Sequence, residues 1–221
     1  MKLLVSAITK FILGIVLVGL LIFIPAGTIK YINGWLFIVL LFVPMLIFGI
    51  YLYIKNPKLL KRRLNNKEKE KTQKIVLLIS ALLFIAGFII SSLDYRYNWS
   101  NIPNYIIIIA SIVLLIGYYL YVKVMLQNEY LLRTIEVEKE QKLIDTGLYS
   151  LVRHPMYFSV LLIFLSIPLI LGSLYGFYIF LFFIVVLIIR IKNEEKVLVK
   201  ELPGYSKYKL KVKYKLIPYI Y

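Results

Sequence analysis

MYFSVLLIFLSIPLIL at residues 156–171 and LYGFYIFLFFIVVLII at residues 174–189 are two apolar runs separated only by Gly172 and Ser173. Neither run contains a charged residue, and each is shorter than the roughly 20 residues that span a bilayer. Backbone polar groups in hydrocarbon need partners within their own segment, so such runs must be helical. The sequence therefore predicts a tight helical hairpin with two legs that are short for complete membrane spans.

Four further apolar runs precede this hairpin, at residues 8–24, 34–54, 75–93 and 104–126. Their lengths approach or exceed that of a bilayer span, and 61% of all residues are hydrophobic. We therefore predict an all-α, polytopic transmembrane bundle of about six helices, with five as the alternative count. No small-residue cleavage site follows the first run, so we interpret it as a retained helix.

Basic residues are unevenly divided between the polar segments that alternate along the chain. Of the 27 Lys and Arg residues, 25 fall on one predicted side of the membrane and 2 on the other. The positive-inside rule then predicts that both termini are cytoplasmic. The net charge of +16 indicates attraction to anionic lipid head groups rather than nucleic-acid binding. The chain has no cysteine, which excludes disulfides and Cys-ligated metal, and we expect no metal site.

The polar stretches between the apolar runs are all short, and no repeat or Ser/Gly-rich linker divides the chain. We therefore predict a single domain over residues 1–221, with an N-terminal four-helix part at 1–126 and a functional part at 127–221. Residues 55–74, which carry a mixed-charge run at 67–71, suit a solvated cytoplasmic loop. Residues 134–138 alternate apolar and acidic side chains. Alternation over residues 210–216 predicts an extended segment on the head groups. The residues expected to anchor the helices at the interfaces are Tyr31, Trp35, Tyr95, Tyr97 and Trp99.

Two polar clusters flank the hairpin on its predicted cytoplasmic side. The segment GLYSLVRHPMY at 147–157 precedes it and holds the only histidine, and RIKNEE at 190–195 follows it. Two passes through the membrane bring these clusters together. Pro155 suits the first position of a helix, which makes His154 the N-cap residue and directs unpaired backbone N–H groups at an anion.

Each cluster also has a structural interpretation. Arg153 and His154 suit side chains that extend to the interface, and Arg190 and Glu194, four residues apart, suit a plain ion pair. Glu195 adds a second carboxylate where the hydrocarbon ends. Ionisable groups so close to a membrane favour a functional site.

The first cluster resembles the hallmark of the isoprenylcysteine carboxyl methyltransferases, whose relatives include phospholipid N-methyltransferases and bacterial membrane methyltransferases. The residues that match this Gly-x-Tyr-x-x-x-Arg-His-Pro-x-Tyr pattern are Gly147, Tyr149, Arg153, His154, Pro155 and Tyr157. The similarity continues through the second cluster and the tail tyrosines to Pro218, and so covers about residues 127–218. The earlier helices agree only in hydrophobicity and in a Gly-Trp-Leu-Phe start at Gly34 that looks like bacterial members.

This resemblance implies an S-adenosylmethionine-dependent methyltransferase in a cell membrane of bacterial type, with the cofactor at the cytoplasmic face. The residues expected to bind the cofactor are Gln141, Lys142, Leu143, Ile144, Tyr149, His154, Pro155, Met156, Tyr157 and Glu194. The resemblance places Arg190 near the acceptor, where a guanidinium orients a carboxylate or phosphate. Glu195 is the second residue expected to be catalytic.

The expected methyl acceptor is lipophilic, and its head group stays open. A prenylated carboxylate needs no base, whereas an ethanolamine head group must first lose a proton, for which Glu195 or a tyrosine is available. The competing class is a transporter or structural bundle. That class would be expected to place ionisable residues at mid-membrane, and the predicted helices have none.

Overall fold

The computed structural model describes residues 2–64, 71–128, 130, 137 and 141–221. Within these residues the chain forms eight α-helices, one short 3₁₀ helix and no strand. The elements are α1 (Lys2–Ala26), α2 (Ile32–Lys55), α3 (Pro57–Leu64), α4 (Lys71–Tyr97), α5 (Asn104–Gln127), η1 (Gly147–Ser150), α6 (Pro155–Ile170), α7 (Leu174–Glu201) and α8 (Tyr205–Lys211). The loop predicted at 55–74 is wrong in part, because residues 57–64 form α3 and α4 begins at Lys71. Residues 65–70 of that loop, and the alternation predicted at 134–138 apart from residue 137, lie outside the described residues.

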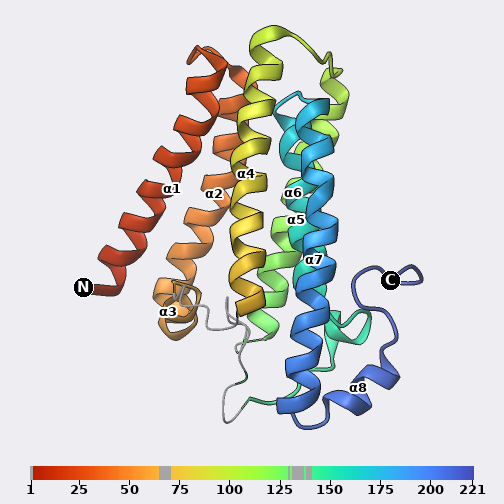
Figure 1. The fold of residues 1–221 in the computed structure, drawn as a ribbon. Helices are drawn as coiled ribbons and strands as arrows, with labels where there is room; N and C mark the ends of the chain where they lie inside the picture. The colour runs from red at the N-terminus through yellow and green to blue at the C-terminus, as the bar shows by residue number, and fades with distance from the viewer. Residues whose placement is uncertain (1, 65–70, 129, 131–136, 138–140) are drawn as a thin grey trace.

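The predicted helical membrane bundle is confirmed, with α1, α2, α4, α5, α6 and α7 running side by side (Figure 1). Five of these helices are long and apolar enough to cross a membrane, and α6, with 16 residues, is the shorter one. The expectation of a short second leg is wrong, because α7 has 28 residues. The apolar run ends at Arg190, but the helix continues because Arg, Lys and Glu are good helix formers. The second polar cluster therefore lies on a continuous helix.

Both ends of the chain lie at one end of the bundle. In Figure 1, α1 begins at the end of the bundle where α8 packs beside the last turns of α7. The C-terminal segment lies at this end too. The link between α4 and α5 lies at the opposite end. Six helices that run side by side return the chain to the end of the bundle where it starts, which agrees with the distribution of basic residues.

Reporter fusions should therefore report opposite sides of the membrane for the link near Tyr97 and for the C-terminal tail. The tail fusion is expected to be cytoplasmic, because 25 of the 27 basic residues fall on its predicted side. Paired phosphatase and fluorescent-protein fusions at both positions would measure this. Two positions on one side would contradict a six-pass bundle.

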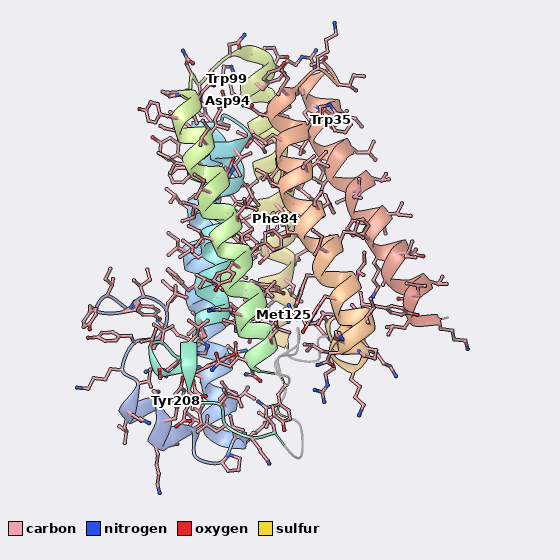
Figure 2. All side chains as sticks on the ribbon, turned by 180° about the vertical axis from the view of Figure 1, so that it is seen from behind. Trp35, Phe84, Asp94, Trp99, Met125 and Tyr208 are labelled. Atoms are coloured by element: carbon pink, nitrogen blue, oxygen red, sulfur yellow. The ribbon has the colours of Figure 1, made fainter. Side chains whose placement is uncertain are left out.

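Small residues bring α7 very close to α4. A Cβ atom on Gly176 would lie 2.0 Å from the Ser91 hydroxyl oxygen, and one on Gly87 would lie 2.2 Å from the Phe180 ring. Close backbone approach at small residues is a common way of packing helices in membranes. Phe84, at mid-bundle in Figure 2, packs edge-on against Phe180. The α4–α7 contact thus holds the helix that carries the second polar cluster.

Hydrogen bonds hold the helices together at the end of the bundle opposite the two termini. Asp94, buried at the end of α4, accepts hydrogen bonds from the hydroxyls of Ser173 at 2.5 Å and Ser100 at 2.7 Å. Ser173 in turn accepts a bond from the Gly176 N–H and so caps α7. The start of α7 is therefore fixed, and the length of this helix determines where the second polar cluster lies.

Tyr31 is not an interface anchor, contrary to expectation. Its side chain is only 1% exposed, its ring stacks on Tyr95 with centroids 3.9 Å apart, and its hydroxyl donates to the Leu171 carbonyl. A tyrosine with this hydroxyl partner is satisfied inside the bundle. Trp35 and Trp99 are about half exposed at the same end of the bundle (Figure 2), as the prediction requires.

The tail is helical where an extended segment was expected to begin. Gly204, with φ of +84°, precedes α8, which ends at Lys211. The buried residues Tyr205, Tyr208 and Val212 recur at helical spacing, whereas Leu210 is exposed. The extended segment predicted for residues 210–216 is therefore wrong at residues 210 and 211, which belong to α8.

Candidate active site

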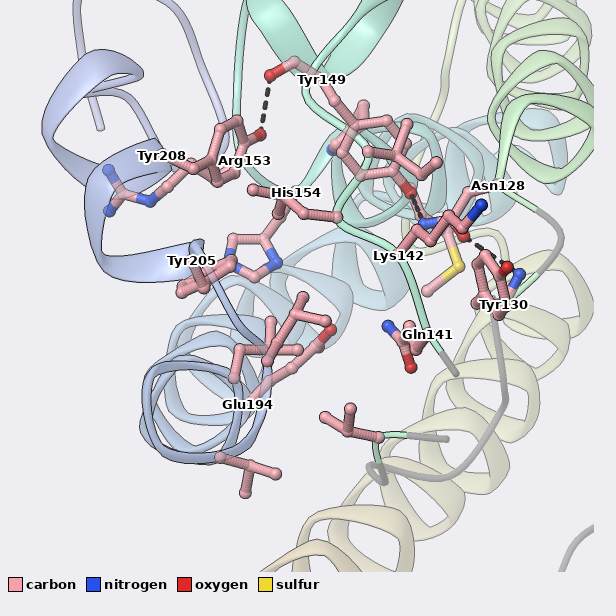
Figure 3. Close-up of a pocket in the computed structure, with 18 of the residues that line it drawn as sticks. Asn128, Tyr130, Gln141, Lys142, Tyr149, Arg153, His154, Glu194, Tyr205 and Tyr208 are labelled. Atoms are coloured by element: carbon pink, nitrogen blue, oxygen red, sulfur yellow. Dashed lines mark hydrogen bonds between the residues drawn. The ribbon is translucent and has the colours of Figure 1, made fainter. Parts of the chain in front are cut away.

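One pocket lies at the end of the bundle where the chain begins and ends. It is lined by residues 141–144, the start of α6, the last turns of α7, and α8 (Figure 3). Every residue predicted to bind a cofactor lines this pocket: Gln141, Lys142, Leu143, Ile144, Tyr149, His154, Pro155, Met156, Tyr157 and Glu194. Arg190 lines it too. The fold therefore brings together segments that are about 50 residues apart in the sequence.

The loop before α6 is held by the end of α5. Gly147 has φ of +54°, and a Cβ atom there would lie 2.5 Å from the side-chain nitrogen of Gln127. Gln127 donates to the Thr146 carbonyl at 2.5 Å and accepts from the Leu148 N–H at 3.3 Å. The glycine of the hallmark is thus required both by its backbone conformation and by this close side chain.

Tyr149 is fixed by two different helices. Its hydroxyl accepts a bond from the amide of Asn128, just after α5, at 3.0 Å, and its carbonyl accepts one from the Tyr208 hydroxyl in α8 at 2.7 Å. Figure 3 shows both bonds at one wall of the pocket. Burial raises the pKa of the Tyr149 and Tyr208 phenols well above their ordinary value. Both side chains therefore remain protonated donors at neutral pH.

Arg153, which lines the pocket, forms a buried ion pair with Glu195, which does not. The Arg153 Nε lies 2.6 Å from Glu195 Oε1, and both side chains are less than 10% exposed. The same carboxylate oxygen is 3.4 Å from Nε2 of His154. Glu195 does not line the pocket, because its side chain is directed at Arg153. Its predicted catalytic role thus gains no support from this geometry.

The same arginine holds the tail beneath the pocket. Its Nη1 donates to the carbonyls of Val212 at 2.7 Å and Lys213 at 2.9 Å. The backbone N–H groups of Arg153 and His154 donate to the carbonyls of Tyr214 and Lys215. Loss of the Arg153 side chain would therefore leave Glu195 without this partner and remove two of the bonds that hold the tail.

Tyr157 connects Arg190 to Glu194. The Arg190 Nε donates to the Tyr157 hydroxyl at 2.9 Å, and that hydroxyl donates to Glu194 Oε2 at 2.5 Å. The guanidinium also lies over the Tyr157 ring, 5.9 Å from its centroid. The two residues of α7 predicted to share a helix face are thus joined through a residue of α6.

His154 precedes α6, as Pro155 at its first position predicted, but its side chain makes no capping bond. The imidazole is buried, with 4% of its side chain exposed. The interpretation that Arg153 and His154 extend to the interface is therefore wrong, because both residues are buried. Because the loop and the tail cover the imidazole, a change at His154 alters packing as well as the pocket.

Several residues that line the pocket were not assigned to the site by sequence reasoning. They are Asn128, Tyr130, Val137, Arg153, Val197, Leu198, Leu202, Tyr205 and Tyr208. The tail tyrosines belonged to the resemblance but carried no assigned chemistry. The apolar residues Val197, Leu198 and Leu202 follow the paired glutamates, and recognising that α7 continues past Glu195 would have identified them.

The pocket combines a carboxylate, cations, aromatic faces and apolar side chains. Glu194 can accept bonds from an ammonium or hydroxyl group, Lys142 can pair with a carboxylate, and Leu143 and Leu198 provide an apolar wall. A nucleoside that carries an amino-acid group could make contacts of these kinds, so the lining is compatible with the cofactor that the resemblance implies. Among the described residues no cluster of His, Asp and Glu is placed to hold a metal ion.

Residues 105–204 match the family model described as phospholipid methyltransferase. The match covers α5, α6 and α7 and most of the pocket. The match agrees with the family that the hallmark indicated and supports a membrane methyltransferase. A search of curated proteins found no match.

Proposed function

We propose that this membrane methyltransferase uses S-adenosylmethionine to methylate a lipid-like acceptor at the end of the bundle that holds the pocket. The observation that carries the proposal is the linkage of Arg190, Tyr157 and Glu194, which joins the two polar clusters of the sequence in one pocket. S-adenosylmethionine supplies an electrophilic methyl group when bound. The pocket residues position the two reactants, and in a displacement at carbon such positioning supplies much of the rate.

Arg190 and Glu194 divide the pocket between acceptor and cofactor in this proposal. Arg190 comes one helical turn before Glu194, so it lies about 6 Å nearer the hydrocarbon by the 1.5 Å rise per residue. A head group that enters from the bilayer meets Arg190 first. Glu194 remains for the cofactor, which enters from the aqueous side. We place that side in the cytoplasm, because most basic residues lie there.

A carboxylate acceptor makes the chemistry simplest. One of its oxygens forms the new bond to the methyl carbon, while the sulfur–methyl bond breaks and its electron pair stays on sulfur. The products are a neutral ester and a neutral thioether, and no proton moves. Pairing with the Arg190 guanidinium orients such a head group through two bonds.

An amine acceptor needs a base, and the geometry gives it less support. Glu195 is bonded to Arg153 at 2.6 Å and lies outside the pocket lining, so taking up a proton would break a buried ion pair. The phenols of Tyr149, Tyr205 and Tyr208 have pKa values raised by burial and stay protonated. We therefore favour O-methylation, with ethanolamine N-methylation as the second candidate.

Purified protein in detergent should bind S-adenosylmethionine in calorimetry. Incubation with the labelled-methyl cofactor and membrane lipids, followed by mass spectrometry, should then reveal a methylated amphiphile. A gain of base-labile methyl ester would favour the carboxylate acceptor, and methylated ethanolamine the amine. Absence of cofactor binding would contradict the proposal.

Glu194→Ala is expected to weaken S-adenosylmethionine binding by roughly 10- to 100-fold, the range of a hydrogen bond to a charged group. Its side chain is only partly buried, so the fold should persist. Glu201→Ala is the matched control, because Glu201 ends the same helix but does not line the pocket. Calorimetry measures both affinities, and equal values would remove Glu194 from the cofactor site. His154→Ala should also weaken binding, with an added loss of thermal stability because the imidazole is buried.

A further inference from the structure

Gln73 lies in the first turn of α4 and is fully buried, with 0% of its surface exposed. It stands far from both polar clusters in the sequence and outside the matched residues 105–204. A buried amide is costly unless it is hydrogen-bonded. The partner of its side-chain oxygen therefore indicates what this polar residue does where the long apolar helix begins.

Gln73 is bonded to the guanidinium at the acceptor end of the pocket. Its side-chain oxygen accepts a hydrogen bond from Nη1 of Arg190 at 3.0 Å. The Nε of Arg190 donates to Tyr157 at 2.9 Å. Two nitrogens of one guanidinium are thus anchored by α4 and α6, and two anchors on different nitrogens define the plane of the group.

The plane of a guanidinium decides what it can bind. Carboxylate and phosphate groups are gripped by two parallel N–H bonds, which form only when the donor and acceptor planes are aligned. An arginine on a long flexible side chain loses rotamer freedom when it binds a ligand. Anchors that already hold the plane remove part of that loss before the acceptor arrives.

We propose that Gln73 is a positioning residue that holds the Arg190 guanidinium in the plane that receives the anionic head group of the methyl acceptor. The inference rests on the proposed role of Arg190 at the acceptor and extends the site to α4, in the part of the chain that the family match does not reach. Gln73 acts through Arg190 and not on the cofactor.

A plain packing role makes a different prediction. If Gln73 only fills the contact between α4 and α7, any loss of packing in that turn would lower activity in proportion to stability. Val76 is three residues further along α4 and is also buried. Val76→Ala therefore serves as a matched control that loosens the same turn without touching the guanidinium.

The first test compares Gln73→Leu with Val76→Ala in methyl transfer to two probes, S-farnesylcysteine and dioleoylphosphatidylethanolamine, in detergent micelles. For the probe that accepts methyl, Gln73→Leu should lower kcat/KM by roughly tenfold, the lower range for a bond to a charged group. Most of the change should appear in the acceptor KM, while the Kd for S-adenosylmethionine stays within about twofold. Unchanged kcat/KM, or an equal loss in Val76→Ala, would overturn the proposal.

The second test asks whether the effect passes through Arg190. Placed on an Arg190→Lys background, Gln73→Leu should add little further loss, because the group that it positions is gone. Fully additive losses would overturn the proposal.

A third measurement needs no acceptor. Phenylglyoxal modifies guanidinium groups, and peptide mass spectrometry gives its rate at Arg190. This rate should rise several-fold in Gln73→Leu, stay near wild type in Val76→Ala, and return towards wild type in Gln73→Glu, which keeps an acceptor oxygen. Gln73→Met replaces the leucine variant if that protein does not fold. Equal modification rates of Arg190 in all variants would overturn the positioning role of Gln73, whether or not a probe is methylated. If neither probe is methylated, that result counts against the proposed acceptors and not against the positioning role.

Discussion

Arg153→Met is expected to lower the free energy of unfolding by about 3–5 kcal/mol, the cost of breaking a buried ion pair from one side. The Glu195 carboxylate, 5% exposed, would be left in the protein without its 2.6 Å partner. The tail would also lose the two bonds from Arg153 Nη1 to the carbonyls of Val212 and Lys213. Thermal denaturation in detergent should show a large fall in Tm.

Two comparisons separate the ion pair from a general effect of charge. Lys209→Gln also removes a cation near Glu195, but Lys209 is 45% exposed and 4.0 Å away, so its Tm should barely change. The double variant Arg153→Met/Glu195→Leu removes both charges and should recover much of the loss. A double variant as unstable as Arg153→Met would contradict the account.

Arg190→Lys is expected to lower methyl transfer by one to two orders of magnitude with little change in S-adenosylmethionine affinity. The guanidinium donates from Nε to Tyr157 and from Nη1 to Gln73, and an ammonium has one nitrogen for both. It also lacks the fork that grips a carboxylate or phosphate through two bonds. Turnover of the acceptor and calorimetry with the cofactor measure the two effects separately.

The alternative for Arg190 is a structural ion pair with Glu194, for which lysine would largely substitute because such helix pairs contribute only about 0.3–0.5 kcal/mol. Arg96→Lys is the matched control, since Arg96 lies in the last turn of α4, at the far end of the bundle from the pocket. Near-normal turnover in Arg190→Lys would favour the structural role and remove Arg190 from the site.

Hydropathy and spacing predicted the bundle and the place of the pocket with few errors. Apolar runs have no alternative to helix in hydrocarbon, and a two-pass hairpin must return its ends to one side. The errors concern the polar ends of the helices, which lie outside the hydrocarbon and are not constrained to be helical in the same way. The continuation of α7 past Arg190, the start of α8 and the burial of His154 all depend on contacts with distant residues.

The sequence alone determined the helical class, the apolar runs and the segments that meet in the pocket, because solvation by lipid and the motif spacing are local properties. Only the tertiary structure decided how the charges pair. Glu194 and Glu195 are adjacent in sequence, yet their carboxylates have different partners. Glu194 lines the pocket and accepts a bond from Tyr157, whereas Glu195 lies outside the lining and accepts one from Arg153. Gln73 reaches Arg190 from 117 residues away. No periodicity encodes such pairings, because they arise from where the packed helices bring side chains within hydrogen-bonding distance.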